Sequence, residues 1–174
     1  GQSKISDWSY DDLVQRDVPG VIKHVRGLFP NMPLIWLGNS LGGHVGLAAK
    51  ACGHLTQISG LILISTNVWL PKLESSRWRR FKKEFGMRTA RLYLQVFRTL
   101  PIVASGFGTV DEAPTYLKNL IDWWDEDVWR GETIDDYLTA LQGLETPLIS
   151  VVGEADRLEA HPDAARAFLN AFGP

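Results

Sequence analysis

Residues 33–43 read PLIWLGNSLGG and place a serine directly after a short apolar run. Continuous hydrophobicity over residues 33–37 indicates a strand that is buried on both faces, as in a parallel sheet covered by helices. The Ala- and Gly-rich residues that follow, 41–51, predict a helix packed closely against that sheet. Ser40 is therefore expected at a sharp turn between strand and helix, and this stretch decides the fold.

Two further apolar runs, at residues 60–65 and 147–152, predict more strands of the same sheet. Apolar residues at helical spacing over 14–28 predict a helix before the first strand, kinked or begun at Pro19. A last helix is expected to open at His161-Pro162. The order helix, strand, helix, strand is that of a right-handed βαβ crossover, so we predict an α/β fold with a mostly parallel sheet and flanking helices.

The residues between the second and third apolar runs predict helices and no strand. Helices are expected at about 75–97, at about 114–124 with a start near Asp111, and from Thr133, with Asp136 three residues on. We interpret residues 69–143 as a helical cap inserted between two core parts, 1–68 and 144–174. Five of the seven tryptophans lie in this cap, and they either line a pocket or fill the core of the cap itself. The candidates for binding substrate are Trp69, Trp78 and Trp123, together with Asn39 beside the serine.

Residues 38–42 fit G-x-S-x-G, the pattern of a nucleophile elbow. A serine on such a turn has a strained backbone, and we expect that only glycine at 38 and 42 avoids steric clashes there. The N–H of Leu41, at the start of the following helix, is expected to donate to an oxyanion. The alternative interpretation is a glycine-rich tight turn whose serine, Ser40, has no chemical role.

A carboxylate follows the third apolar run, in the turn Gly153-Glu154-Ala155-Asp156. Because the carboxyl ends of parallel strands meet at one edge of a sheet, Asp156 is expected on the same edge as Ser40. An aspartate in that place holds a histidine in the correct tautomer and stabilises its charged form. Glu154 and Asp163 are rival acids, and a surface carboxylate without a role remains an alternative.

Residues 29–43 (FPNMPLIWLGNSLGG) and the turn at 153–156 together resemble the α/β-hydrolase superfamily. Within it, the chain is most similar to the lysophospholipase-like and serine-aminopeptidase-like branch, over nearly its whole length. The resemblance implies Ser40 as the nucleophile, Leu41 N–H as one oxyanion donor and Asp156 as the acid of a catalytic triad. It implies hydrolysis of an ester, or less readily an amide, with a hydrophobic group. Asn39 stands where a histidine is common in this branch.

Two features that the resemblance implies are not found in the chain. They are a second oxyanion donor from an early loop and a histidine after a further strand. None of the four histidines is expected to replace it. His24 is expected far from the site, and His44 too deep in the helix after Ser40 to approach the hydroxyl. His54 is expected at the end of that helix, and His161 as the cap of a later helix. We therefore expect a sequence cut at both ends and inactive alone. A non-catalytic binding or regulatory module would explain the missing histidine without truncation, and acyl transfer or haloperoxidase chemistry on the same triad also stays open.

The composition narrows the possible partners. A net charge of −2 disfavours nucleic acid, and the basic run at 77–83 is interpreted as a solvated helix face. No apolar run is long enough for stable membrane insertion, so the cytoplasm is the default expectation, although the chain starts without Met. No cluster has the spacing of metal ligands, so we expect no cofactor, and a small hydrophobic ester is the expected partner.

Overall fold

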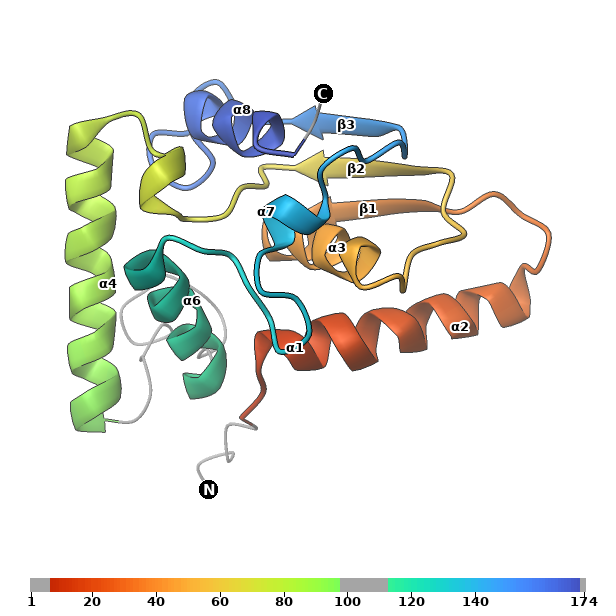
Figure 1. Cartoon of the computed structure of the whole chain (residues 1–174), viewed down its shortest axis with the longest axis horizontal. Helices are drawn as coiled ribbons and strands as arrows, with labels where there is room; N and C mark the ends of the chain where they lie inside the picture. The colour runs from red at the N-terminus through yellow and green to blue at the C-terminus, as the bar shows by residue number, and fades with distance from the viewer. Residues whose placement is uncertain (1–6, 98–112, 173–174) are drawn as a thin grey trace.

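The core of the fold is an open sheet of three parallel strands, in the order β1-β2-β3, in a computed structural model that describes residues 7–97 and 113–172 (Figure 1). The strands are β1 (Ile35–Asn39), β2 (Gly60–Ile64) and β3 (Leu148–Val151). Leu37 pairs with Ile62, which pairs in turn with Ile149. The predicted α/β class with a parallel sheet is confirmed, and β1 lies two residues further along than the apolar run indicated.

The segment before β1 is one continuous helical stretch. It consists of α1 (Tyr10–Asp12), a π-helical turn η1 (Leu13–Asp17) and α2 (Val18–Leu28). Ser9 begins it with a capping box, in which Ser9 and Asp12 satisfy each other's backbone N–H groups. Pro19 lies in the first turn of α2, as the sequence indicated, directly after the π-helical turn. Its missing N–H leaves one gap in the hydrogen bonds of the continuous stretch.

Helix α3 (Leu41–Ala51) packs very closely on the sheet, and two glycines allow it. A Cβ added to Gly43 would lie 2.0 Å from Thr66 Oγ1, and one added to Gly46 would lie 2.1 Å from Trp36 Nε1. Every residue from Gly43 to Ala49 is buried. The helix predicted from the Ala- and Gly-rich composition is confirmed.

The described helices cover only one face of the sheet. Leu61 and Leu63 of β2 are buried on that face, whereas the other face carries large apolar side chains that are at least half exposed: Ile35, Leu37, Ile149 and Val151. The prediction that the strands are buried on both faces is therefore wrong for the described part of the chain. The apolar runs have the composition of a doubly covered sheet, but composition does not say which face a helix covers.

The segment between β2 and β3 is helical, as predicted. It contains the short η2 (Pro71–Leu73), the long α4 (Arg77–Phe97), α6 (Pro114–Glu126) and the short α7 (Tyr137–Ala140). The predicted start of the second helix at Asp111 lies outside the described residues. The predicted start of the third at Thr133 is wrong, because Asp136 is the residue that caps α7, accepting from Leu138 N at 2.9 Å.

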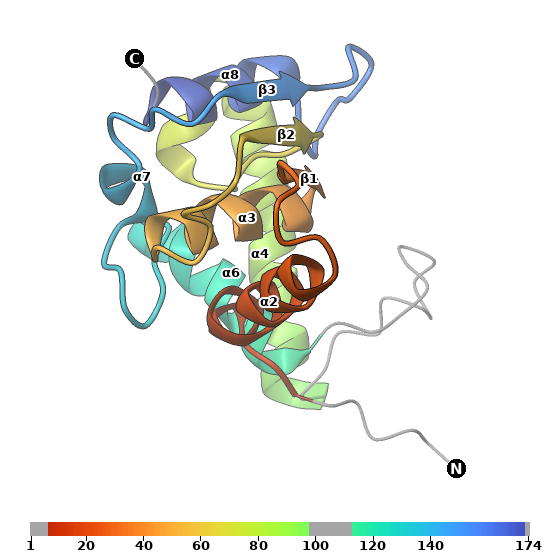
Figure 2. The same cartoon turned by 90° about the vertical axis from the view of Figure 1, so that its right-hand side faces the viewer.

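Helices α4 and α6 pack against each other to one side of the sheet, and α8 (Pro162–Asn170) follows β3 (Figures 1 and 2). Trp129 and Tyr137 lie in the same hydrophobic core as Leu47 of α3 and Phe168 of α8. The residues interpreted as a cap thus share part of their core with the sheet, and the boundaries 69 and 143 stay a prediction. Among residues 7–97 and 113–172, no helix combines the length and the apolar character needed to cross a membrane.

Candidate active site

Ser40 lies between β1 and α3 with a backbone that few non-glycine residues adopt. Its φ is 48° and its ψ is −115°, and its N–H donates to the carbonyl of Ile64 at 2.9 Å. Strained dihedrals of this kind persist only where the surroundings enforce them, and they cluster at functional sites. The sharp turn expected from the sequence is present at Ser40.

The two glycines of the motif differ in their steric need. A Cβ added to Gly38 would lie 2.3 Å from the carbonyl oxygen of Gly42, so glycine is required at 38 as predicted. A Cβ added to Gly42 would meet nothing within 4 Å, so the expected clash at 42 is wrong. The backbone of Gly42, rather than its missing side chain, makes the close approach. The glycine of α3 that the packing requires is Gly43.

Helix α3 directs its N-terminal amides toward the serine. Ser40 is the N-cap residue, its carbonyl accepts from Gly43 N at 3.0 Å, and its side chain makes no capping bond. The N–H of Leu41 has no acceptor among the described residues. Free amides at a helix N-terminus attract negative charge. The N–H of Leu41 therefore has the position and the free donor that an oxyanion site needs.

A pocket of about 170 Å³ opens beside Ser40. Its walls come from the ends of β1 and β2, from α3, α4 and α6, and from the loop after β3; the residues are Ser40, His44, Ser65, Asn67, Val68, Trp69, Met87, Tyr116, Leu120, Trp123 and Glu159. The predicted Trp69 and Trp123 are among them. Asn39 is exposed at the end of β1, and Trp78 is 64% exposed on α4, so the structure brings neither into this pocket.

His44 lines the same pocket as Ser40, but no hydrogen bond joins its ring to the hydroxyl of Ser40, so the expectation that it lies too deep to approach that hydroxyl stays a prediction. Its Nδ1 lies 3.0 Å from the hydroxyl of Tyr10, whose ring stacks on the imidazole with Trp123 at its edge. Burial lowers the pKa of His44 to about 3. An imidazole that is so hard to protonate is a poor general base, because it must accept a proton in the transition state.

The other three histidines lie away from Ser40. His24 is exposed on α2, and His54 lies beyond the end of α3. His161 is the N-cap of α8, as predicted, and accepts from a backbone N–H of the first turn. Within the described part of the chain, no histidine ring forms a hydrogen bond with the side chain of Ser40 or Asp156; only the backbone N–H of His44 donates to the carbonyl of Ser40, at 3.4 Å. Nor does any cluster of His, Cys, Asp or Glu there have the arrangement of a metal site.

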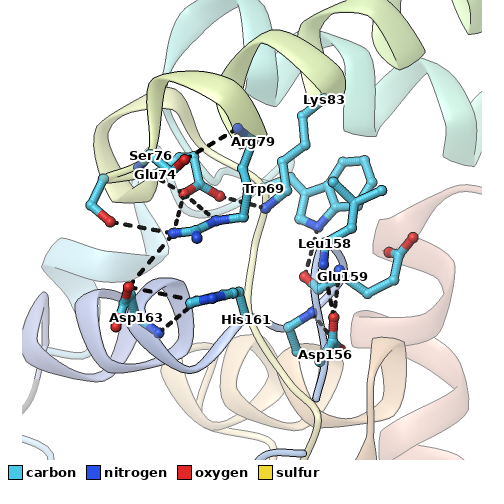
Figure 3. Close-up of polar contacts among 12 residues, drawn as sticks. Trp69, Glu74, Ser76, Arg79, Lys83, Asp156, Leu158, Glu159, His161 and Asp163 are labelled. Carbon is cyan, nitrogen blue, oxygen red and sulfur yellow. Dashed lines mark hydrogen bonds and ion pairs between the residues drawn. The ribbon is translucent and has the colours of Figure 1, made fainter. Parts of the chain in front are cut away.

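Asp156 lies in the loop after β3, and its carboxylate is held by backbone amides (Figure 3). Oδ1 accepts from Leu158 N at 3.0 Å and Glu159 N at 2.9 Å, and Oδ2 accepts from Ala160 N at 2.9 Å. Burial raises the pKa of Asp156, but the three hydrogen bonds outweigh it and hold the pKa below its ordinary value. The group is therefore a fixed anion at neutral pH.

The two rival acids have other surroundings. Glu154 is exposed, and Asp163 lies in the first turn of α8, with its carboxylate 3.8 Å from Arg79 (Figure 3). Asp156 is thus the best ordered of the three carboxylates. Its place as a triad acid stays a prediction, because its carboxylate contacts no histidine ring nitrogen in the described residues.

Glu159 and Asn67 line the pocket and were not singled out from the sequence. Burial raises the pKa of Glu159, and the carbonyl of Glu159 accepts from Trp69 Nε1 at 3.1 Å (Figure 3). The Nδ2 of Asn67 is buried without a hydrogen-bond partner among the described residues. Asn67 lies three residues after the end of β2. The expectation that side chains just after parallel strands gather at one edge of the sheet, which was applied to Asp156, would have predicted Asn67 as well.

Part of the basic run at 77–83 turns inward. Arg79 and Lys83 contact the buried carboxylate of Glu74, and Lys83 Nζ also lies 4.8 Å from the centre of the Trp69 ring (Figure 3). The interpretation of the run as a solvated helix face is wrong for these two side chains. The cluster joins α4 to the wall of the pocket through Trp69.

The whole chain, residues 1–174, matches the family model described as "Serine aminopeptidase, S33". Among solved structures it is similar to a monoacylglycerol lipase of Paleococcus ferrophilus, at 13% identity and a TM-score of 0.55, over 98% of this chain and 64% of that one. It is also similar to a thermophilic esterase of Thermogutta terrifontis, at 20% identity and a TM-score of 0.53, over 99% of this chain and 64% of that one. The chain therefore spans 64% of the length of each. No curated protein matches.

Proposed function

The chain belongs to the serine aminopeptidase S33 family of α/β-hydrolases, and from this premise we propose that it carries the nucleophile of a serine hydrolase for hydrophobic esters. The observation that carries the proposal is the backbone of Ser40, strained at φ 48° and placed at a pocket. This strained turn presents the hydroxyl of Ser40 to the cavity, directly before the N-terminus of a helix, which is the arrangement that a nucleophilic serine needs.

A second serine in the pocket offers a comparison. Ser65 also lines the cavity and also has a positive φ, of 45°. It follows β2, however, and no helix begins at the next residue. Ser40 is followed at once by α3, so only Ser40 has a free helix amide, that of Leu41, beside it. The same reaction at Ser65 would lack this oxyanion donor.

The proposed reaction is an acyl transfer in two steps. Ser40 Oγ attacks the ester carbonyl, its proton passes to a general base, and the negative charge on the oxygen is stabilised by Leu41 N–H. The alcohol leaves with that proton, and water then releases the acid from the acyl-enzyme. Asp156, ionised and held by backbone amides, is proposed to orient the base.

The base that this reaction needs is a histidine, and none of the four in these 174 residues has a suitable place. His44 is the nearest in sequence, and burial holds it neutral against Tyr10. Without a base the hydroxyl of Ser40 stays protonated and is a weak nucleophile. We expect the 174-residue chain alone to have negligible esterase activity.

The lining of the pocket supports a hydrophobic substrate. Trp69, Met87, Leu120 and Trp123 give it apolar walls. Asn67 adds a buried donor, Nδ2, which has no partner in the described chain and is proposed to bind a polar oxygen of the substrate. Apolar side chains supply the larger part of the lining, which favours an acyl chain over a charged peptide.

A second candidate is a module that binds hydrophobic esters without cleaving them. It is favoured by one observation, the neutral, buried state of His44, the only histidine in the pocket. In this case the strained turn at Ser40 would serve only to shape the cavity. Fold alone does not separate the two candidates.

Imidazole in solution distinguishes them, since it can replace a missing histidine. Turnover of nitrophenyl esters from acetate to decanoate is measured with and without imidazole, for the wild type, Ser40→Ala and Ser65→Ala. A hydrolase is expected to show turnover above the imidazole background that Ser40→Ala removes and Ser65→Ala retains. Esters that bind, measured by fluorescence titration, but are never cleaved above background would favour the binding module.

Turnover without imidazole that is lost in Ser40→Ala would confirm the nucleophile but contradict the expected inactivity of the chain alone. Turnover that is lost in Ser65→Ala but kept in Ser40→Ala would make Ser65 the nucleophile and would contradict our proposal.

A further inference from the structure

Helix α4 carries a row of large apolar side chains on its outer face. Trp78, Phe81, Phe85, Leu92 and Val96 are 58–66% exposed. At 100° per residue, they fall within a sector about 60° wide along the whole helix. We call these five residues the α4 stripe. Exposed apolar residues that occur singly need no explanation, but a continuous row indicates an interaction surface.

The α4 stripe is not part of the contact between α4 and its neighbours. The opposite side of the helix makes that contact: Met87 packs with Ile121 and Trp124 of α6, and Met87 also lines the pocket beside Ser40. Figure 1 shows α4 at the margin of the molecule with α6 on its inner side. The helix thus has two apolar faces, and only the inner one is covered in the described structure.

Basic side chains border the stripe. Arg77, Lys82 and Arg88 are exposed on α4 within about 40° of the edges of the stripe, and the exposed Arg80 lies further round the helix. Of these, Arg88 is paired with a glutamate, Glu84. Within the stripe, the rings of Trp78 and Phe81 stack with their centres 5.8 Å apart, and Lys82 Nζ lies 5.3 Å from the centre of the Trp78 ring. The whole chain has a net charge of −2, so this concentration of cations is local to α4.

We propose that the α4 stripe docks on an anionic lipid surface, with the helix lying in the plane of the interface. Tryptophan, phenylalanine and leucine bordered by lysine and arginine are the composition of helices that bury one face at the headgroup boundary. The basic border complements anionic headgroups, each cation contributing roughly a fivefold gain in binding. The helix does not cross the bilayer, because its other face belongs to the protein interior.

A second copy of the chain fits the stripe less well. In a two-fold symmetric dimer with parallel α4 helices, Arg77 and Lys82 of the two copies would face one another. With antiparallel helices they would face the apolar end of the partner's stripe. Neither arrangement offers these cations an opposite charge from the stripe, whereas an anionic lipid surface does. The charge on the border of the stripe therefore selects the lipid surface.

The docking has a consequence for the pocket, and in this one respect it rests on the proposed function. Helix α4 separates the stripe from the cavity, with Trp78 on one side and Met87 on the other. A docked helix would place one wall of the cavity at the lipid headgroups, where a hydrophobic ester is concentrated. The binding itself requires no chemistry at Ser40.

Flotation with vesicles tests the proposal. Vesicles of phosphatidylcholine alone are compared with vesicles that also contain about 30% phosphatidylserine, which makes their surface anionic. The wild type is expected to float with the anionic vesicles. The variant Trp78→Gln/Phe81→Gln/Phe85→Gln is expected to lose binding to both kinds. The variant Arg77→Gln/Arg80→Gln/Lys82→Gln is expected to lose roughly a hundredfold in affinity for the anionic vesicles only.

A matched control removes three apolar side chains of similar exposure elsewhere, Leu28→Gln/Phe29→Gln/Met32→Gln, and is expected to bind as the wild type does. Circular dichroism checks that each variant is folded, and Ser40→Ala must also bind, which separates docking from the proposed reaction. The proposal is overturned if the wild type does not float, or if the control loses as much binding as the stripe variant. A wild type that is dimeric by light scattering, with a monomeric stripe variant and no flotation, would assign the stripe to a second copy instead.

Discussion

Lys83 Nζ lies 3.0 Å from Glu74 Oε2, and both side chains are almost completely buried, at 2% and 1% exposure. Burial by itself raises the pKa of Glu74, but hydrogen bonds from Lys83, Ser76 and Arg79 outweigh it and hold that pKa below its ordinary value. The pair joins η2 to α4 directly behind Trp69, a wall of the pocket. A buried charge pair at this junction fixes how the long helix meets the rest of the chain.

Removing one member of that pair should be far more damaging than removing both. Glu74→Leu leaves the ammonium of Lys83 buried without its counter-ion and is expected to lower the free energy of unfolding by about 3–5 kcal/mol. The double variant Glu74→Leu/Lys83→Met should recover much of this loss, since apolar residues often replace a buried pair without penalty; the remainder persists because Arg79 also loses its contact with Glu74. Urea unfolding measures both. Lys118→Met, which breaks an exposed pair with Asp122, is the control and should have no measurable effect. Equal losses in Glu74→Leu and Lys118→Met would contradict the role of burial.

Two adjacent glycines of α3 should respond in opposite ways to a methyl group. Gly43→Ala forces a Cβ against Thr66 and is expected to lower the free energy of unfolding by about 1–3 kcal/mol. Gly42→Ala meets open space and should be neutral or slightly stabilising, because alanine favours helices. Thermal and urea unfolding of the two variants compare them directly. A larger loss in Gly42→Ala than in Gly43→Ala would show that the packing of α3 on the sheet differs from the structure.

The backbone strain at Ser40 should make the glycine variant more stable than the alanine variant, the reverse of the usual order inside a helix. Alanine keeps the unfavourable φ of 48°, whereas glycine adopts it freely. Ser40→Gly is therefore expected to be more stable than Ser40→Ala by about 1 kcal/mol, within the range for a residue held in a sparsely populated conformation. Ser76 precedes α4 as Ser40 precedes α3, but it has no positive φ, so the same two substitutions there measure the preference for glycine at a helix N-terminus alone. The advantage of glycine over alanine should be larger at 40 than at 76, and equal advantages would mean that the strain is absent.

The buried imidazole of His44 predicts a loss of stability in mild acid. Its pKa falls from 6.5 to about 3 on folding, so the unfolded chain binds the extra proton between these pH values and the folded chain does not. Stability is therefore complete above about pH 6.5 and decreases as the pH falls toward 3, by ~1.4 kcal/mol per pH unit from this group. His44→Asn should flatten the dependence in this window, and His24→Asn, which removes an exposed histidine, should not. Urea unfolding at pH 7, 6, 5 and 4 measures the slopes, and equal slopes in all three proteins would refute the assignment.

The turn at Ser40 could be predicted from sequence because its requirements are local. Gly38 is needed by a contact only four residues away, with the carbonyl of Gly42, and the apolar run before it marks the strand. The position of Asp156, in the loop just after a strand, was predicted in the same way, whereas its role in a triad stays a prediction. Both predictions used spacing along the chain, which the backbone converts directly into position.

The residues that were missed depend on contacts that spacing does not reveal. Trp78 has the same composition signal as Trp69, but it lies on the outer face of α4, and helical spacing alone does not say which face meets the core. That His44 lines the pocket was not foreseen, because the pocket extends along α3 toward Tyr10. Glu159 faces the pocket only because the loop after β3 folds back around the carboxylate of Asp156.

The uncovered face of the sheet, with Ile35, Leu37, Ile149 and Val151, changes how one common assay must be interpreted. Dyes such as anilinonaphthalene sulfonate fluoresce when they bind apolar surface, and their signal is ordinarily taken as the mark of a partly folded state. This chain presents such a surface while its three strands are paired with one another in a regular sheet. Bright dye fluorescence from the native protein is therefore expected, and near-UV circular dichroism is the better indicator of whether its side chains are packed.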